Sequence, residues 1–179
     1  MRRTAFVLFF TLCATAVIGH AQAAESATSR QFTINAGGMA SYFQPDDGGN
    51  GLAGAGTFVD LHFTHWFQVE GEARWLRWNQ YYGERQDNYL IGPRVPIKQF
   101  GDRTQLFGKA MIGYGKMTFP FGYGYGTFTD LAFGAAVDHQ MGRKLSVKAD
   151  FEYQYWPVWL NNSSLAPYGA SVGVGYRVF

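Results

Sequence analysis

From Gln31 to the C-terminus, apolar and polar residues alternate with a period of two, which is typical of β-strands with one apolar face. In the first stretch, Phe32, Ile34 and Tyr42 share one face, and Thr33 and Asn35 lie on the other. The same pattern returns along the chain and predicts about eight antiparallel strands, which cover residues 31–42, 55–64, 67–76, 88–97, 105–114, 129–138, 145–155 and 170–178.

The connections between these stretches alternate in length. Longer loops are predicted at 44–52, 81–86, 118–127 and 157–167, and tight turns near His65, at 100–102 and at 140–143. Long loops at one end and short turns at the other are typical of up-and-down barrels that cross a membrane. The sequence therefore predicts an all-β fold, an eight-stranded antiparallel up-and-down transmembrane β-barrel.

The volume of the side chains decides which face points outward. The apolar face carries large residues such as Phe63, Trp75 and Phe133, whereas the other face carries small and charged residues. The interior of an eight-stranded barrel is just wide enough to be filled by side chains, so small residues and paired charges suit it better than many aromatics. The alternative is a soluble barrel with its apolar face inward. The large apolar side chains favour the outward arrangement, which is stable in lipid because a closed barrel leaves no backbone group unpaired.

Individual positions follow from this assignment. We expect four residues to face lipid at mid-depth: Ile112, Phe133, Val147 and Val172. Aromatic residues near the strand ends predict two girdles at the membrane interfaces. Those assigned to the outer girdle include Trp75, Trp78, Tyr153, Tyr155 and Trp156.

The first residues have the features of a secretory signal. Arg2 and Arg3 precede an apolar segment at 5–19, and Ala21-Gln22-Ala23 offers small residues at −3 and −1. A retained membrane anchor is the alternative. We expect a signal peptide at 1–23, cleavage before Ala24 and a single barrel domain at 24–179.

The mature chain offers little for cofactor, thiol or nucleic-acid chemistry. The only cysteine of the sequence, Cys13, lies in the predicted signal peptide and would be removed with it. Without Arg2 and Arg3, 13 basic residues remain against 13 acidic ones, so no basic surface for nucleic acid is expected. We predict no cofactor and no nucleic-acid partner.

Three motifs resemble the small eight-stranded outer-membrane barrels of the OmpA transmembrane-domain, OmpX and opacity-protein type. They are YLIGPR at 89–94, ADFEYQ at 149–154 and the closing GVGYRVF at 173–179. The resemblance implies an outer-membrane location among lipid and lipopolysaccharide, and insertion by the barrel-assembly machinery. It also implies that Tyr176 and the terminal Phe179 act as the assembly signal. The family usually ends Tyr-Arg-Phe, whereas here Val178 intervenes.

The predicted lumen is rich in charge. Either these side chains line a narrow conduit, or they form a salt-bridge core that replaces a hydrophobic one. A loop centred on residues 82–84 would place Arg94 level with Glu72 and Arg74, so we expect an Arg94–Glu72 or Arg94–Glu70 ion pair with Lys109 as a secondary partner. The predicted network comprises Asp60, Glu70, Glu72, Arg74, Arg94, Lys109, Asp130, Lys148, Asp150, Glu152 and Arg177.

The sequence shows no catalytic constellation. His62, His65 and His139 fall near the tight turns, so Ser163 and Ser164 in the last loop have no histidine base nearby. We therefore predict no catalytic residue and no metal site, and a non-enzymatic structural or surface-interaction role. A lipid A-modifying enzyme and a narrow channel remain alternatives.

The loop at 119–126 is the most distinctive outward feature, because it consists of Phe, Gly, Pro and Tyr. It is either a recognition surface for an unknown surface ligand or a strand extension whose aromatics enter the outer membrane interface. Its candidate interaction residues are Phe119, Phe121, Tyr123 and Tyr125.

Overall fold

The computed structural model describes residues 32–46, 50–80, 82–159 and 163–178. The predicted signal peptide and the terminal Phe179 lie outside the described residues. The strands are β1 Thr33–Gln44, β2 Leu52–His62, β3 Gln68–Trp78, β4 Arg85–Phe100, β5 Thr104–Thr118, β6 Tyr125–Gln140, β7 Leu145–Trp159, β8 Ser163–Leu165 and β9 Tyr168–Arg177.

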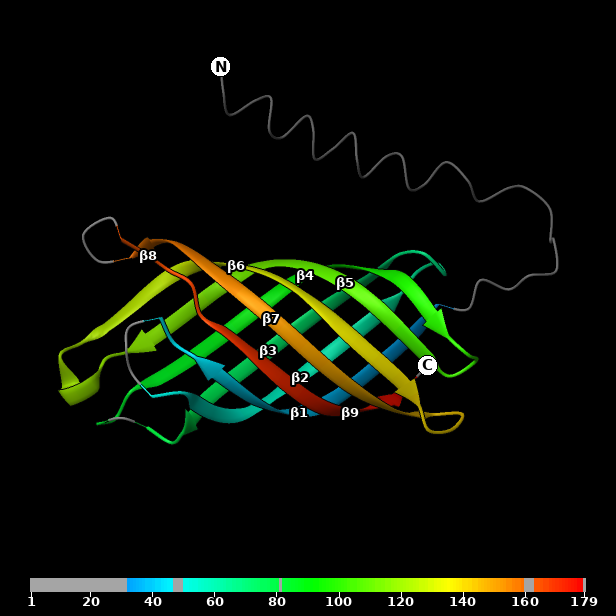
Figure 1. Ribbon diagram of the computed structural model, residues 1–179, viewed down its shortest axis with the longest axis horizontal. Coiled ribbons are helices and arrows are strands. Elements are labelled where there is room, and N and C mark those ends of the chain that lie inside the picture. The colour runs from blue at the N-terminus through cyan, green and yellow to red at the C-terminus, as the bar shows by residue number, and fades with distance from the viewer. Residues whose placement is uncertain (1–31, 47–49, 81, 160–162, 179) are drawn as a thin grey trace, which may run out of the picture. The chain divides into compact units, whose positions relative to one another are not determined.

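All strand pairs are antiparallel, and they close into a barrel (Figure 1). Consecutive strands pair from β1 to β7, β9 pairs with β7, and β1 pairs with β9. The short β8 pairs with the end of β7 just before β9 begins. Together, β8 and β9 occupy the position of the eighth strand of the barrel. Pro167, which has no N–H to donate, stands between them, and its carbonyl accepts a bond from the Gln154 N–H at 2.7 Å. The predicted eight-stranded antiparallel barrel is confirmed.

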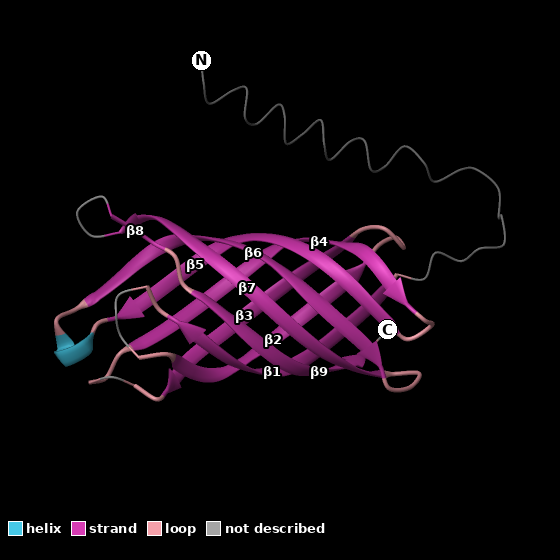
Figure 2. Cartoon of the chain, in the orientation of Figure 1, coloured by secondary structure: helices cyan, strands magenta, loops and turns pink. Residues whose placement is uncertain are grey.

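The connections separate the two ends of the barrel. Short turns at 63–67, 101–103 and 141–144 lie at the end of the barrel where β9 finishes, and the longer connections lie at the opposite end (Figure 1). Gly101 adopts a φ of 61°, which glycine tolerates without strain and which allows the tight β4–β5 turn. The loop after β5 contains a 3-10 turn, η1 at Pro120–Gly122 (Figure 2). Among the described residues, no helix has the length and apolar character needed to cross a membrane.

Side chains alternate between the lumen and the outer surface as predicted. Ile112 is 54% exposed, Phe133 54% and Val172 60%, whereas Glu70 and Arg94 are fully buried inside. Val147 points outward as well and is half-buried. Trp156 differs from the prediction: it shares the inward parity of Glu152 and Gln154, so it lies inside the barrel and not in the outer girdle.

The predicted register between β3 and β4 is wrong. Arg94 lies opposite Gln68, and Glu72 lies opposite Leu90, so Arg94 is not level with Glu72 or Arg74. The reason is the compact connection, in which Asn79 and Tyr82 adopt positive φ angles of 59° and 47°. This turn allows β4 to begin at Arg85.

Candidate functional site

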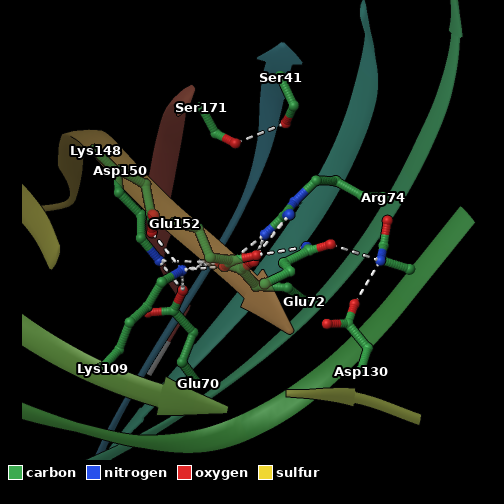
Figure 3. A network of polar contacts seen from close by, with 12 residues as sticks. Ser41, Glu70, Glu72, Arg74, Lys109, Asp130, Lys148, Asp150, Glu152 and Ser171 are labelled. Carbon is green, nitrogen blue, oxygen red and sulfur yellow. Dashed lines mark hydrogen bonds and ion pairs between the residues drawn. The ribbon is translucent and has the colours of Figure 1, made fainter. Parts of the chain in front are cut away.

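Charged side chains from β2 to β7 meet in the middle of the lumen (Figure 3). Lys109 is the centre of this charged layer. Its ammonium lies 2.5 Å from Asp150, 2.8 Å from Glu72 and 3.0 Å from Glu152. It lies 3.5 Å from Glu70. One cation thus contacts four carboxylates from two strands that neither adjoin each other nor adjoin β5.

A second group of ion pairs extends toward the short turns. Arg94 lies 3.0 Å from Asp60, 3.3 Å from Glu70 and 2.9 Å from Asp138. Lys148 lies 2.5 Å from Glu70 and 3.4 Å from Asp60. The Arg94–Glu70 pair is one of the two expected alternatives. Asp60 lies directly opposite Glu70, and the two cations neutralise this pair of like charges.

Toward the outer loops the charged layer merges into a layer of amides. Arg74 donates to Glu152 through two bonds of 2.9 Å and also contacts Glu72. Asn88 donates to Asp130 at 2.5 Å, and Gln154 donates to Glu152 at 2.8 Å. These bonds connect buried polar side chains of β3, β4, β6 and β7 across the bore.

The structure brings together most of the predicted network. Nine members share ion pairs: Asp60, Glu70, Glu72, Arg74, Arg94, Lys109, Lys148, Asp150 and Glu152. Asp130 is buried but is bonded to Asn88 and not to a cation among the ion pairs of the described residues. Arg177 was placed wrongly in the network. It ends β9 at the short-turn rim, where its side chain is exposed to solvent.

Three aromatic rings inside the barrel face the cations of the network. The guanidinium of Arg94 lies 3.8 Å from the ring centroid of Phe107, that of Arg74 lies 4.5 Å from Phe43, and the Lys148 ammonium lies 4.3 Å from Phe58. Such contacts stabilise a cation that has lost its water. Phe58 and Phe107 are functional residues that the sequence did not reveal, because alternation places them on the inward face but does not show which cation they meet.

Glycines on neighbouring strands leave the space that these rings occupy. A Cβ atom at Gly37 would lie 2.6 Å from the Phe58 ring, and one at Gly169 would lie 2.4 Å from the Phe43 ring. The glycine content of the chain is therefore partly a packing requirement of the lumen.

Apolar side chains close the outer end of the lumen. Along β7 the inward residues run from Trp156 through Gln154 to Glu152, so the apolar group lies nearest the long loops. The ring of Phe128 stacks on Trp156 at a centroid distance of 4.0 Å and an interplanar angle of 20°. Two buried clusters lie there, and we call them together the outer plug: one consists of Met117, Phe128, Trp156 and Leu165, and the other of Phe43, Leu52 and Leu76.

The aromatic loop divides into an inner and an outer part. Phe119 is half-buried and packs against the outer plug. Phe121 is 59% exposed and stacks on Tyr82, with 4.1 Å between ring centroids, and Tyr123 packs edge-on against Phe121 at 6.1 Å. Tyr125 is also exposed, at the start of β6. The contact between Tyr82 and Phe121 was not predicted, because the sequence does not show that their two loops meet.

Tyr176, one of the two predicted assembly residues, lies at the opposite end. Tyr176 is 47% exposed on the outer surface of β9, and the Lys144 ammonium lies 5.6 Å from its ring centroid. Phe179 lies outside the described residues.

Histidines His62, His65 and His139 all lie near the short turns, away from the outer rim, and the Thr104 hydroxyl is 2.9 Å from His139 Nδ1. Carboxylate oxygens of Glu70, Glu72 and Asp150 lie within 4.8 Å of one another, close enough to hold a cation. The ammonium groups of Lys109 and Lys148 already supply the positive charge there.

An outward apolar face around a closed, polar-filled lumen defines a β-barrel of the outer membrane. The chain belongs to the family described as outer membrane protein beta-barrel domain, whose model matches residues 9–177. No curated protein matches the chain significantly.

Several solved structures share the fold. Neisserial surface protein A has a TM-score of 0.64 at 10% identity, over 81% of this chain and 96% of that one. The N-terminal barrel domain of OprF from Pseudomonas aeruginosa gives 0.59 at 13%, over 82% and 99%. Ail from Yersinia pestis, in complex with the heparin analogue sucrose octasulfate, gives 0.55 at 21%, over 81% and 96%. These likenesses concern the fold alone.

Proposed function

We propose that this outer-membrane barrel is a non-enzymatic structural and surface-interaction protein, whose filled body anchors outer loops that meet the surroundings. The observation that carries the proposal is the filling of the lumen by two successive layers. The outer plug includes the fully buried Trp156 and Leu76, and the charged layer beneath it includes the fully buried Arg94 and Glu70. Beyond the plug, Phe121 and Tyr123 remain exposed.

The filled lumen disfavours a channel. An eight-stranded barrel has little free bore, and here aromatic rings and ion pairs occupy it. The refolded mature protein should therefore give no unitary conductance steps in planar bilayers in which a porin control conducts. Reproducible steps would refute the closed body and favour the narrow channel.

The position of the histidines disfavours a lipid A-modifying enzyme. A hydrolase or acyltransferase acting on outer-leaflet lipid needs its nucleophile and base at the outer rim. The described histidines lie at the other end. Mass spectrometry of lipid A from cells with and without the protein should give identical spectra, and a mass change that depends on expression would overturn the non-enzymatic assignment.

The exposed rings of Tyr82, Phe121 and Tyr123 are the candidate surface for an external ligand, because flat aromatic faces stack on other rings and on sugars. A glycan array probed with the protein in lipid nanodiscs tests this role. The double variant Phe121→Ser/Tyr123→Ser should lose binding at least about tenfold. The matched control is Trp66→Ser/Phe67→Ser, which removes an aromatic pair at the short-turn end and should leave binding unchanged. Equal loss in both variants, or no binding, would reduce the role to a structural one.

Export and assembly complete the proposal. A signal cleaved before Ala24 would deliver the chain to the periplasm, and Tyr176 with Phe179 would present the assembly signal to the barrel-assembly machinery. N-terminal sequencing of protein from fractionated envelopes tests the cleavage. Recovery of a cleaved, soluble periplasmic protein would contradict the assembly step.

A further inference from the structure

A group of cations lies on the outer surface of the barrel at the ends of β3, β4 and β5. Arg77 and Arg85 are exposed, and Lys116 is half-buried. Asp87 lies opposite both Trp75 on β3 and Lys116 on β5, so these residues form one cross-strand row. We call Arg77, Arg85 and Lys116 the flank cations.

The flank cations exceed the acids that can neutralise them. Arg77 pairs with Asp87 at 2.9 Å, with side-chain exposures of 48% and 19%. The Lys116 ammonium lies 4.9 Å from the ring centroid of Tyr125, and Arg85 takes part in none of the ion pairs found among the described residues. Three positive charges therefore surround one negative charge.

The other described acids at this end are placed elsewhere. Glu84 is fully buried, and Asp46 lies on the β1–β2 loop, where it accepts a bond from the Ala166 N–H at 3.2 Å. Asp87 is therefore the acid that pairs with a flank cation in the ion pairs found among the described residues.

The rows beneath the flank cations match the layers of a membrane. Tyr89 lies opposite Tyr114, and Trp75 donates to the Tyr89 hydroxyl at 3.0 Å, which forms an aromatic row. One step deeper, Ile91 lies opposite Ile112, and both are more than half exposed. Aromatic belts mark the headgroup level, so the flank cations lie at or just beyond the outer headgroups.

We propose that this flank binds the phosphorylated glycolipid of the outer leaflet, lipopolysaccharide, through its lipid A phosphates. The phosphates would contact Arg77, Arg85 and Lys116, and the acyl chains would lie along Ile91 and Ile112. Arginine suits this role because its planar fork matches phosphate oxygens. The inference rests on the outer-membrane placement and not on the loop ligand, so the glycan experiment can fail without affecting it.

The test is a titration of the refolded mature protein, in zwitterionic detergent micelles, with bisphosphorylated lipid A, followed by native mass spectrometry. A surface cation adjacent to anionic lipid contributes roughly fivefold in affinity. The triple variant R77Q/R85Q/K116Q should therefore bind about a hundredfold more weakly, and D87N should bind about threefold more tightly. The matched control K98Q/R103Q/K144Q removes three cations from the short-turn end and should change affinity by less than about threefold.

Two further arms identify the ligand chemistry. Lipid A without phosphates should bind at least about tenfold more weakly, and about 10 mM inorganic phosphate should not displace the intact lipid. Heat-modifiable migration shows whether each variant folds. If the triple variant does not fold, the single variant R85Q replaces it, because R85Q breaks no ion pair of the described residues. R85Q should bind lipid A roughly fivefold more weakly. Equal losses in the two triple variants, equal binding of dephosphorylated lipid A, or displacement by phosphate would each overturn the proposal.

Discussion

The guanidinium of Arg94 lies 3.3 Å from the carboxylate of Glu70, although the two residues are not opposite each other on β4 and β3. Glu70 lies opposite Gly92, which has no side chain to pair with it, because a Cβ there would lie 2.1 Å from the Ala110 carbonyl oxygen. Arg94 is long enough to reach along the strand, and it also contacts Asp60 and Asp138 at 3.0 and 2.9 Å. A single residue thus joins three acids from three strands.

Replacement of Arg94 should therefore destabilise the barrel more than the loss of a surface charge. Arg94→Leu leaves Asp60 and Glu70 with Lys148 as their nearest cation, so we expect a loss of about 3–5 kcal/mol in the free energy of unfolding. The measurement is urea unfolding of refolded protein, with heat-modifiable migration as a second readout. Arg143→Leu, in an exposed turn, is the matched control and should change stability by less than about 1 kcal/mol. Equal unfolding midpoints for the two variants would refute a salt-bridge core.

Gly115 should tolerate no side chain, because it makes room for the outer plug. A Cβ at this position would lie 2.6 Å from the ring of Phe128, which is itself held against Trp156. Gly115→Ala should cost about 1–3 kcal/mol of unfolding free energy, and the second change Phe128→Leu should recover part of it. Gly142→Ala is the control, since nothing lies within 4 Å of its added Cβ. A silent Gly115→Ala would show that the ring can move.

The cost of charge on the outer surface should depend on depth. Ile112 is 54% exposed beneath the aromatic row, so Ile112→Arg should cost about 2–4 kcal/mol in unfolding from lipid vesicles. Thr127, which is exposed on the outer surface opposite Lys116, lies at the outer interface, and Thr127→Arg should cost at most about 1 kcal/mol. Equal costs at both positions would contradict the placement of Ile112 in hydrocarbon.

Parity along each strand could be predicted from the sequence, because a slip of one residue would move a whole strand's apolar face inside. The register between neighbouring strands could not be predicted, because it depends on the conformation of the turns. In the β3–β4 turn, for example, the non-glycine residues Asn79 and Tyr82 adopt positive φ angles. For the same reason the Tyr82–Phe121 stack was not predicted. It joins two different loops, and the alternation of residues along the strands does not show which loops contact each other.

The filling of the lumen was only half predicted. Alternation placed Lys109 and Glu152 inside, but contacts that span the bore depend on the closed geometry and not on any one strand. Small residues and charges were predicted for the lumen from its narrow bore, but its glycines also create space for rings such as Phe58. Arg177 follows the inward parity but lies at the rim, where solvent replaces a partner.

Lys109 should be the least replaceable side chain of the charged layer. Its ammonium contacts Asp150 at 2.5 Å, Glu72 at 2.8 Å and Glu152 at 3.0 Å. The Lys109 side chain is fully buried. Lys109→Met keeps most of the volume and removes the charge, so the carboxylates repel one another without compensation, and the expected loss is about 3–5 kcal/mol.

Removal of one of these acids should relieve the repulsion. Asp150→Asn in the Lys109→Met background should therefore recover on the order of 1 kcal/mol, whereas Asp150→Asn alone should destabilise the native protein. The double-mutant cycle, measured by urea unfolding in vesicles of uncharged lipid, isolates this coupling. Lys98→Met, which removes an exposed lysine on β4, controls for the loss of charge and should leave the unfolding midpoint unchanged. Strictly additive free energies for Lys109→Met and Asp150→Asn would show that the two charges do not interact, because water screens them from each other. The lumen would then be hydrated, which would favour a narrow channel over a salt-bridge core.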